Sequence, residues 1–200
     1  AAGEEISSGC VSLTGLLRGE ALTLPYYRDA GLQEWVDRTI AAEGIGTAVV
    51  FSSAMAQYLA PHPSLRKLID FCDVDSAKWT QYAPDHRWPL SWLYRREGER
   101  LLAFEKTVAA AADHAFFATE AEAALFLGAA PEFCGKVSAM SNGVDADFFS
   151  PEHTFASPYA PDEVPLVFTG AMDYWPNVDA VKWFATAIFP PLQADWPNLR

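Results

Sequence analysis

The sequence predicts an α/β protein with a Rossmann-like, mostly parallel sheet and helices on both of its faces. Short, continuously apolar runs recur along the chain and alternate with segments whose apolar residues have helical spacing. This alternation is typical of parallel strands that are joined by helices. The chain has 200 residues, of which 50% are hydrophobic, and this is enough to bury a sizeable core.

The first half of the chain contains two of the predicted strands. Residues 32–42 have apolar positions at helical spacing, and Gly44 ends this predicted helix. The segment 47–51 is rich in β-branched residues and is typical of a strand buried on both faces. A second buried strand is predicted over 68–72. Ser76 follows it as a candidate N-cap for the next helix.

The middle of the chain continues the alternation. A long amphipathic helix is predicted over about 91–112, and a strand over 115–118 follows it. Thr119 and Glu122 fit a capping box, in which Thr119 accepts from a helical amide and Glu122 reaches back to the cap. The next predicted strand covers 137–140.

The composition changes after Pro151, where five prolines occur within about 25 residues. Such a stretch indicates the end of one domain and the beginning of another. We therefore expect a first Rossmann-like domain over 1–150 and a linker over 151–164. Residues 165–200 are expected to begin a second, truncated domain.

Residues 165–200 contain one predicted strand, over 166–169, and one predicted helix. Asn177 is the candidate N-cap of this helix, and Pro190 and Pro191 are expected to end it. A single strand cannot form a sheet, so this segment must cover its apolar face elsewhere. It could dock on the first domain or pair with a second copy, and we expect the homodimer because an exposed apolar strand pairs readily at its edge.

Several motifs occur together in an order that resembles a known enzyme family. They are the run 116–122, Asn142-Gly143-Val144-Asp145 with Phe148-Phe149 and Pro151, the run 166–170 and the run 170–180. In this order they resemble the group-1 (family four) glycosyltransferases, which have two Rossmann-like domains (GT-B type). Within that family they are most similar to the sugar transferases of bacterial exopolysaccharide and exosortase systems. The resemblance covers about 68–200.

The resemblance implies transfer of a sugar from a nucleotide-sugar to a lipid-linked or polysaccharide acceptor, with retention at the anomeric carbon. It implies no metal or other cofactor. It also implies that 1–150 is most of the acceptor-side domain and that 165–200 is the start of the donor-side domain. The chain alone is therefore expected neither to transfer sugar nor to bind the nucleotide-sugar. The longer protein is expected in the cytoplasm, with peripheral membrane association.

Two other readings of the sequence remain open. One is a different nucleotide-binding Rossmann-like protein, although no Gly-x-Gly-x-x-Gly fingerprint occurs in the sequence. The other is a non-catalytic α/β module that serves in binding or scaffolding. Paired glutamates of the family's second domain would separate an enzyme from a scaffold.

The candidate residues for the acceptor side follow the first two predicted strands: Ser53, Asp73, Asp75 and Ser76. Ligands of open α/β sheets bind beyond the carboxyl ends of the strands. Asp73 and Asp75 also form an Asp-x-Asp pattern, which holds a divalent metal in glycosyltransferases with a single nucleotide-binding domain. Asp145 and Asp147 match the same short pattern. We expect a role in the cleft, or helix capping and solvation, rather than a metal site.

The candidate residues between the domains and on the donor side are Asn142, Gly143, Asp145, Gly170, Asp173 and Asn177. A glycine between a strand and a helix N-terminus lets backbone amides approach a phosphate. The basic residue that commonly follows this glycine in the family is missing here. A purely structural turn at Gly170 therefore stays open beside the ligand contact.

Charge and cysteine content disfavour several classes of partner. The formal net charge of −12 disfavours nucleic acid and anionic membranes as general partners. Three widely spaced cysteines without a Cys-x-x-Cys argue against structural zinc or a disulfide framework and favour a reducing cytoplasm. The basic run at Arg95, Arg96 and Arg100 is interpreted as a solvated helix face. The tryptophans at 79, 88 and 92 could stack on sugar rings, but core packing is the favoured interpretation.

Overall fold

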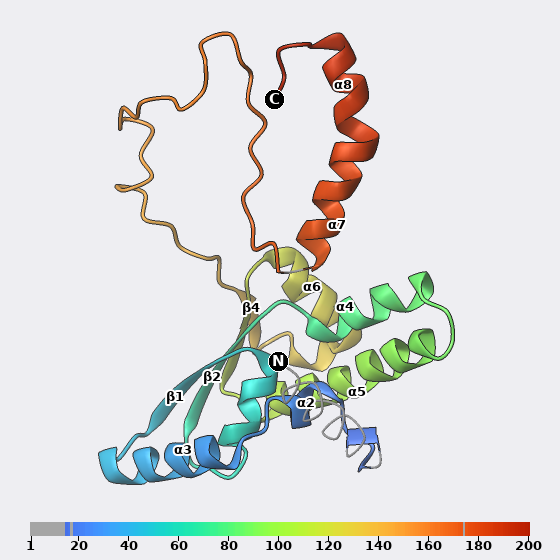
Figure 1. Ribbon diagram of the computed structural model, residues 1–200. Helices are drawn as coiled ribbons and strands as arrows, with labels where there is room; N and C mark the ends of the chain where they lie inside the picture. Colours follow the sequence, from blue (N-terminus) through green and yellow to red (C-terminus); the bar gives the residue numbers. More distant parts are fainter. Residues whose placement is uncertain (1–14, 17, 174) are drawn as a thin grey trace. The chain divides into compact units, whose positions relative to one another are not determined.

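A computed structural model describes residues 15, 16, 18–173 and 175–200 (Figure 1). The chain divides into two compact units, Ala1–Gly143 and Val144–Arg200. The predicted α/β fold class is confirmed, because the first unit has a four-stranded parallel sheet with helices around it.

The sheet of the first unit has its strands in the order β1-β2-β3-β4, and every neighbouring pair is parallel. The strands are β1 (Thr47–Phe51), β2 (Arg66–Cys72), β3 (His114–Phe117) and β4 (Val137–Ala139). All four were predicted to within two residues. Their apolar runs are short and bounded by glycine, proline or polar residues, which is why the pattern located them so closely.

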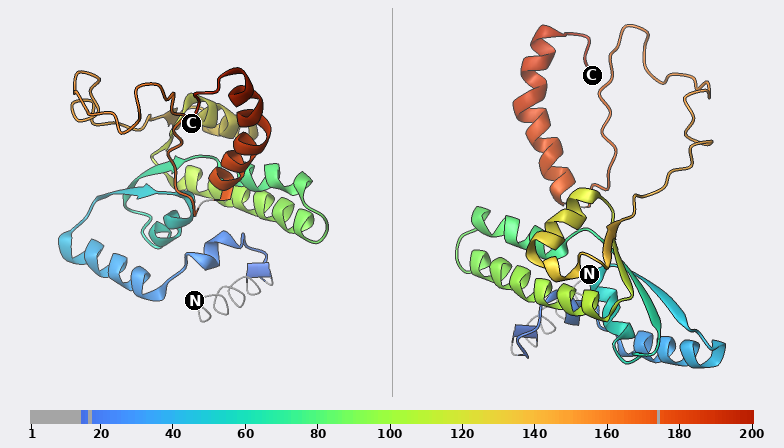
Figure 2. Two further views of the ribbon diagram at one scale, coloured as in Figure 1. Left: turned by 45° about the horizontal axis from the view of Figure 1, so that its top comes forward. Right: turned by 180° about the vertical axis from the view of Figure 1, so that it is seen from behind.

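The helices of the first unit precede, connect and follow these strands (Figures 1 and 2). They are α2 (Thr23–Tyr26), α3 (Ala30–Glu43), η1 (Ser53–Leu59), α4 (Asp75–Tyr82), η2 (Ala83–Asp85), α5 (Leu90–Ala111), α6 (Glu120–Ala129) and η3 (Pro131–Phe133). Gly44 ends α3 with φ of 61°, a left-handed conformation that glycine adopts without strain. Thr119 accepts from the Glu122 amide at 3.1 Å, as the capping box predicted.

The core lies on one side of the sheet. Val50, Ile69, Ala115 and Val137 are opposite one another across the four strands, and all are buried. Three phenylalanine rings extend this row: Phe71 and Phe117 stack at 5.1 Å between centroids, and Phe126 of α6 lies 5.1 Å from Phe117. Burial of these rings supplies much of the driving force for folding.

Strand β1 differs from its prediction, because it is not buried on both faces. Val49 is 71% exposed and Phe51 is 70% exposed, whereas Val50 between them is buried. Side chains alternate across a strand, so only one face of β1 contacts the core. A continuous apolar run therefore did not distinguish this edge strand from a central one.

Glu97 of α5 is a buried carboxylate that fixes the start of α2. It accepts from the Leu22 amide at 2.6 Å and from the Thr23 amide at 2.8 Å. These amides belong to the first turn of α2, where no carbonyl of the helix is available to accept from them. The sequence separation of about 75 residues hides this cap from local patterns.

The second unit contains one helical segment, made of α7 (Trp175–Trp183), the π-turn η4 (Phe184–Ile188) and α8 (Phe189–Asp195). The predicted end of the helix at Pro190 and Pro191 is wrong. These prolines lie in the first turn of α8, where an amide donor is not needed, and the π-turn precedes them. Asn177 is also not the N-cap, since α7 begins two residues before it.

The predicted strand over 166–169 is wrong as well. Val164 forms an isolated parallel bridge with Leu199, and the Leu166 amide donates to the Arg200 carbonyl at 2.7 Å. The backbone partners of Val164 and Leu166 are Asn198, Leu199 and Arg200, and residues 165–169 form no continuous ladder. Across the described residues of both units, no helix is long and apolar enough to cross a membrane.

Candidate ligand-binding site

The candidate site begins where β1 and β2 end, at the carboxyl edge of the sheet. Ser52 has φ of 74° and Cys72 has φ of 64°, although neither is glycine. Such backbone strain persists only where the surroundings fix it, and it is concentrated at functional sites. Here the Asp70 residue fixes both positions: its carbonyl accepts from the Ser52 amide at 2.8 Å and its carboxylate from the Cys72 amide at 3.0 Å.

The two strained turns bring Ser53 and the loop after β2 together. The Ser53 hydroxyl donates to Asp75 Oδ2 at 3.1 Å, and Ser53 is fully buried. Asp73 and Asp75 are both partly exposed, with 45% and 31% of their side chains accessible. Three of the four predicted acceptor-side residues thus lie in one cluster with acceptor oxygens open to solvent.

Lys78 joins the two carboxylates, and sequence reasoning missed it. Its Nζ lies 2.8 Å from Asp73 Oδ2 and 3.3 Å from Asp75 Oδ1. Burial acts to lower the pKa of Lys78, but the hydrogen bonds and charges of the two aspartates outweigh it and raise the pKa above its ordinary value. Asp75 and Lys78 are three residues apart. When both are placed in α4, this spacing predicts an ion pair on one face of the helix.

Lys78 changes what the Asp-x-Asp pattern can do. Its ammonium lies between the two carboxylates, where a divalent cation would be held in a metal site. Within the described part of the chain, no group of three or more His, Cys, Asp or Glu residues is arranged to hold a metal ion. The cluster therefore offers carboxylate acceptors and an ammonium donor side by side, above the buried hydroxyl of Ser53.

Ser76 lies beneath this cluster rather than in it, and its predicted role as N-cap is wrong. Val74 occupies the N-cap position of α4, while Ser76 is buried and its hydroxyl donates to Glu105 at 2.6 Å. The backbone amides at the start of α4 are capped by side chains that are distant in the sequence. Glu105 accepts from the Ser76 amide at 3.1 Å, and Glu122 accepts from the Val74 amide at 2.7 Å.

Glu122 therefore acts differently from its prediction, because its carboxylate serves α4 and does not reach back to its own helix cap. Glu105 is the residue that responds to pH. Burial raises its pKa to about 7, hydrogen bonds from Ser76 oppose the shift, and the charge of Asp75 adds to it. The charge beneath the cluster thus changes close to neutral pH.

Cys72 is not a nucleophile at this site. Burial and the neighbouring charge of Asp70 raise the pKa of its thiol to about 11, so the thiol stays protonated. Nucleophilic cysteines require the opposite environment, one that lowers the thiol pKa. Of the described cysteines, Cys72 and Cys134 are both free.

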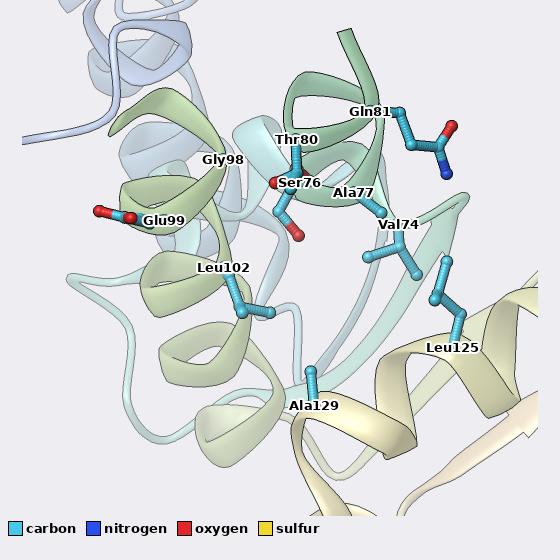
Figure 3. Close-up of a pocket in the computed structure, with 10 residues that line it drawn as sticks. All are labelled: Val74, Ser76, Ala77, Thr80, Gln81, Gly98, Glu99, Leu102, Leu125 and Ala129. Atoms are coloured by element: carbon cyan, nitrogen blue, oxygen red, sulfur yellow. The ribbon is translucent and has the colours of Figure 1, made fainter. Parts of the chain in front are cut away.

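An open, mainly apolar pocket of about 400 Å³ lies between α4, α5 and α6 (Figure 3). Val74 and Ser76, from the loop and first turn beneath the cluster, form one wall. Leu102 and Leu125 extend into the space from α5 and α6, and Glu99 points away from it (Figure 3). The polar cluster and this pocket are thus built on the same turn.

The candidate residues between the domains are divided between the two units. Asn142 and Gly143 are the exposed last residues of the first unit, and Asp145 belongs to the second. The Asp145 carboxylate accepts from the Phe148 amide at 2.9 Å, which closes a local turn. This contact gives Asp145 a structural role within its own segment.

The donor-side candidates lie in the loop before α7. Asn177 Nδ2 donates to the Ala171 carbonyl at 2.9 Å and holds the loop against the helix. A Cβ at Gly170 would lie 3.0 Å from that same amide nitrogen, so a larger residue would have to displace it. Asp173 is exposed. A side chain at position 170 would therefore be tightly packed and would have to shift the Asn177 side chain.

Comparisons with protein-family models, curated proteins and solved structures found no match for this chain. The functional assignment therefore rests on the residues and their geometry. The strongest geometric feature is the polar cluster at the carboxyl edge of the sheet, on two strained turns.

Proposed function

We propose that this chain belongs to a sugar transferase that moves a sugar from a nucleotide-sugar to a lipid-linked or polysaccharide acceptor in exopolysaccharide biosynthesis. The first unit carries the acceptor side, and the second unit contributes the beginning of the donor side. Transfer proceeds with retention and without a metal, and the protein acts in the cytoplasm.

The cluster of Asp73, Asp75 and Lys78 with Ser53 is the observation that carries the proposal. A sugar presents several adjacent hydroxyl groups, each of which both donates and accepts hydrogen bonds. Partly exposed carboxylates accept from such hydroxyls, and the ammonium of Lys78 donates to them. The strained positions Ser52 and Cys72 favour a functional role for this edge over simple solvation.

The loop from Gly170 to α7 supports the donor side of the proposal. A glycine that precedes the start of a helix is a position where backbone amides can bind a phosphate oxygen, and Gly170 precedes α7 in this way. The second unit follows the order of extended segment, helix and extended segment, with Val164 parallel to Leu199. This is the order in which a Rossmann-like unit begins. The described residues of this unit form no sheet that could hold a nucleotide, so we expect no donor binding by this chain.

Ligand-observed NMR on the 200-residue chain tests the proposal. The panel contains saccharides and, separately, UDP- and GDP-sugars at millimolar concentration. We expect saturation transfer to at least one saccharide and none to the nucleotide-sugars. The double variant Asp73→Asn, Asp75→Asn should weaken saccharide binding about tenfold or more, because it removes charged acceptors.

The matched control is Asp145→Asn with Asp147→Asn, which alters the second Asp-x-Asp pattern of the sequence. This variant should bind saccharide as the unaltered chain does. If no saccharide binds, or if both double variants lose binding equally, the acceptor site is not at the carboxyl edge. Saturable micromolar binding of a nucleotide-sugar would refute the expectation that this chain does not bind the donor.

A further inference from the structure

The connection that leads from η2 into the first two turns of α5, residues 86–96, exposes three large apolar side chains that are close in the sequence. Trp88 is 80% exposed, Trp92 is 51% exposed and Leu90 is 46% exposed. The prediction that Trp88 and Trp92 are core residues is therefore wrong. Helices α4 and α5 lie side by side, and their connection is at the end remote from the sheet (Figures 1 and 2). Grouped apolar side chains on a protruding surface indicate an interaction site.

The charge of this connection is opposite to that of the whole chain. Residues 86–96 contain three arginines and no aspartate or glutamate, while the chain has a net charge of −12. Arg87 and Arg95 are exposed, whereas Arg96 donates to the Glu20 carbonyl at 3.1 Å. Two acids flank residues 86–96 in the sequence. Asp85 precedes the segment, and Glu97, which follows it, is buried in its capping contacts with α2.

We propose that the connection of residues 86–96 docks on the surface of an anionic lipid bilayer. Tryptophan is well suited to the interfacial layer, because its ring is apolar and its N–H can bond to headgroups or water. Arginines beside it pair with lipid phosphates. This inference rests on the surface itself and not on the proposed sugar transfer.

The acidic remainder of the chain makes the docking local. An anionic bilayer attracts Arg87 and Arg95 but repels acidic surfaces, so the connection is the part that enters the headgroup layer. Trp35 on α3 offers a comparison, since it is 57% exposed yet lies between Glu34 and Asp37 in the sequence. Trp35 should therefore not support docking on an anionic bilayer, although its exposure is comparable, because its neighbours are acidic.

Vesicle sedimentation of the 200-residue chain tests this inference. The vesicles contain phosphatidylcholine alone or with about one third phosphatidylglycerol, at low and physiological salt. We expect sedimentation with the anionic vesicles, weakened by salt and lost without the anionic lipid. The variant Arg87→Glu, Arg95→Glu should lower the vesicle affinity about tenfold or more, from the loss of two surface cations.

The variant Trp88→Ser, Leu90→Ser removes the apolar part and should lower the vesicle affinity to a similar extent. Trp35→Ser is the matched control and should bind as the unaltered chain does. Far-UV circular dichroism checks that each variant folds. We expect all of them to fold, because the substituted side chains are exposed. Failure to sediment with anionic vesicles, or binding that the connection variants leave unchanged, overturns the inference. Docking to an acidic protein in place of the bilayer would be recognised by this same lack of vesicle binding.

Discussion

In the first unit Ile69, Phe71 and Phe117 lie on adjacent strands and are each at most 2% exposed. In the second unit Val167, Trp183 and Trp196 are 61–66% exposed, and Leu199 is the one buried hydrophobic residue among the described ones. A helical segment beside a single isolated bridge has no second layer on which to pack. The first unit therefore carries a core that can hold a site in place, and the second unit does not.

The same contrast separates the two candidate sites. The acceptor cluster lies on strand ends that the core fixes, and buried Glu105 and Ser53 support it from below. The Gly170 loop is held by the Asn177 contact within an exposed segment. Preorganised polar groups bind ligands better than mobile ones, since less conformational entropy is lost. Ligand binding by this chain should thus be confined to the first unit.

The largest expected effect is the loss of an aromatic ring from the core of the first unit. Phe71→Ala should lower the free energy of unfolding by about 3–5 kcal/mol, because it leaves a cavity among stacked rings. Trp183→Ala in the second unit should change it by less than about 0.5 kcal/mol. Urea unfolding followed by circular dichroism measures both. Equal destabilisation by the two variants would remove the contrast between the units.

A smaller effect is expected from pH, through Glu105. Its pKa is about 7 in the folded state, above the ordinary value of 4.5 that applies to the unfolded chain. The folded state therefore holds the proton more tightly, so stability is highest below about pH 4.5 and falls until about pH 7. The fall attributable to this group is about 3 kcal/mol at most.

The variant Glu105→Gln isolates this contribution. Its stability should be nearly independent of pH between about 5 and 8, apart from the carboxylates that both proteins share. Thermal melting at a series of pH values compares the two proteins. The same dependence of stability on pH in the two proteins between about pH 5 and 8 would contradict the raised pKa of Glu105.

The fold could be predicted from local patterns, whereas much of the candidate site could not. The strands and the caps at Gly44 and Thr119 depend on residues within one or two turns, so the sequence displays them directly. Ser76 was wrongly made an N-cap because its partner Glu105 is 29 positions away. The edge exposure of Val49 likewise depends on packing that no local pattern records.

Lys78 was accessible to sequence reasoning in principle but not identified. The Asp-x-Asp pattern drew attention to oxygen ligands, while the cation between them lies within the next helical turn. The helix was predicted to begin after its candidate N-cap Ser76, so Asp75 lay outside it and the spacing of three residues carried no meaning. Placing the first turn of α4 correctly would have revealed the pair.

The smallest stability effect is expected at Lys78. Lys78→Met should change the free energy of unfolding by less than about 1 kcal/mol, because the ion pairs are partly exposed. Calorimetric titration with Mn²⁺ should show no micromolar site in the unaltered chain. In Lys78→Met the two carboxylates lose their cation, and weak Mn²⁺ binding should appear. A micromolar site in the unaltered chain, lost in Asp75→Ala, would mean that the metal displaces the lysine.

Hydrogen exchange at two backbone amides tests the contrast between the units most directly. The Ala115 amide donates to the Lys136 carbonyl at 2.8 Å within the buried sheet, and the Leu166 amide donates to Arg200 at 2.7 Å beside the isolated bridge. Their hydrogen bonds are alike, so any difference in exchange reports the surrounding packing. We expect Ala115 to exchange about a thousandfold or more slowly than Leu166. Equal protection of the two amides would contradict the account, because the second unit would then have a core of its own.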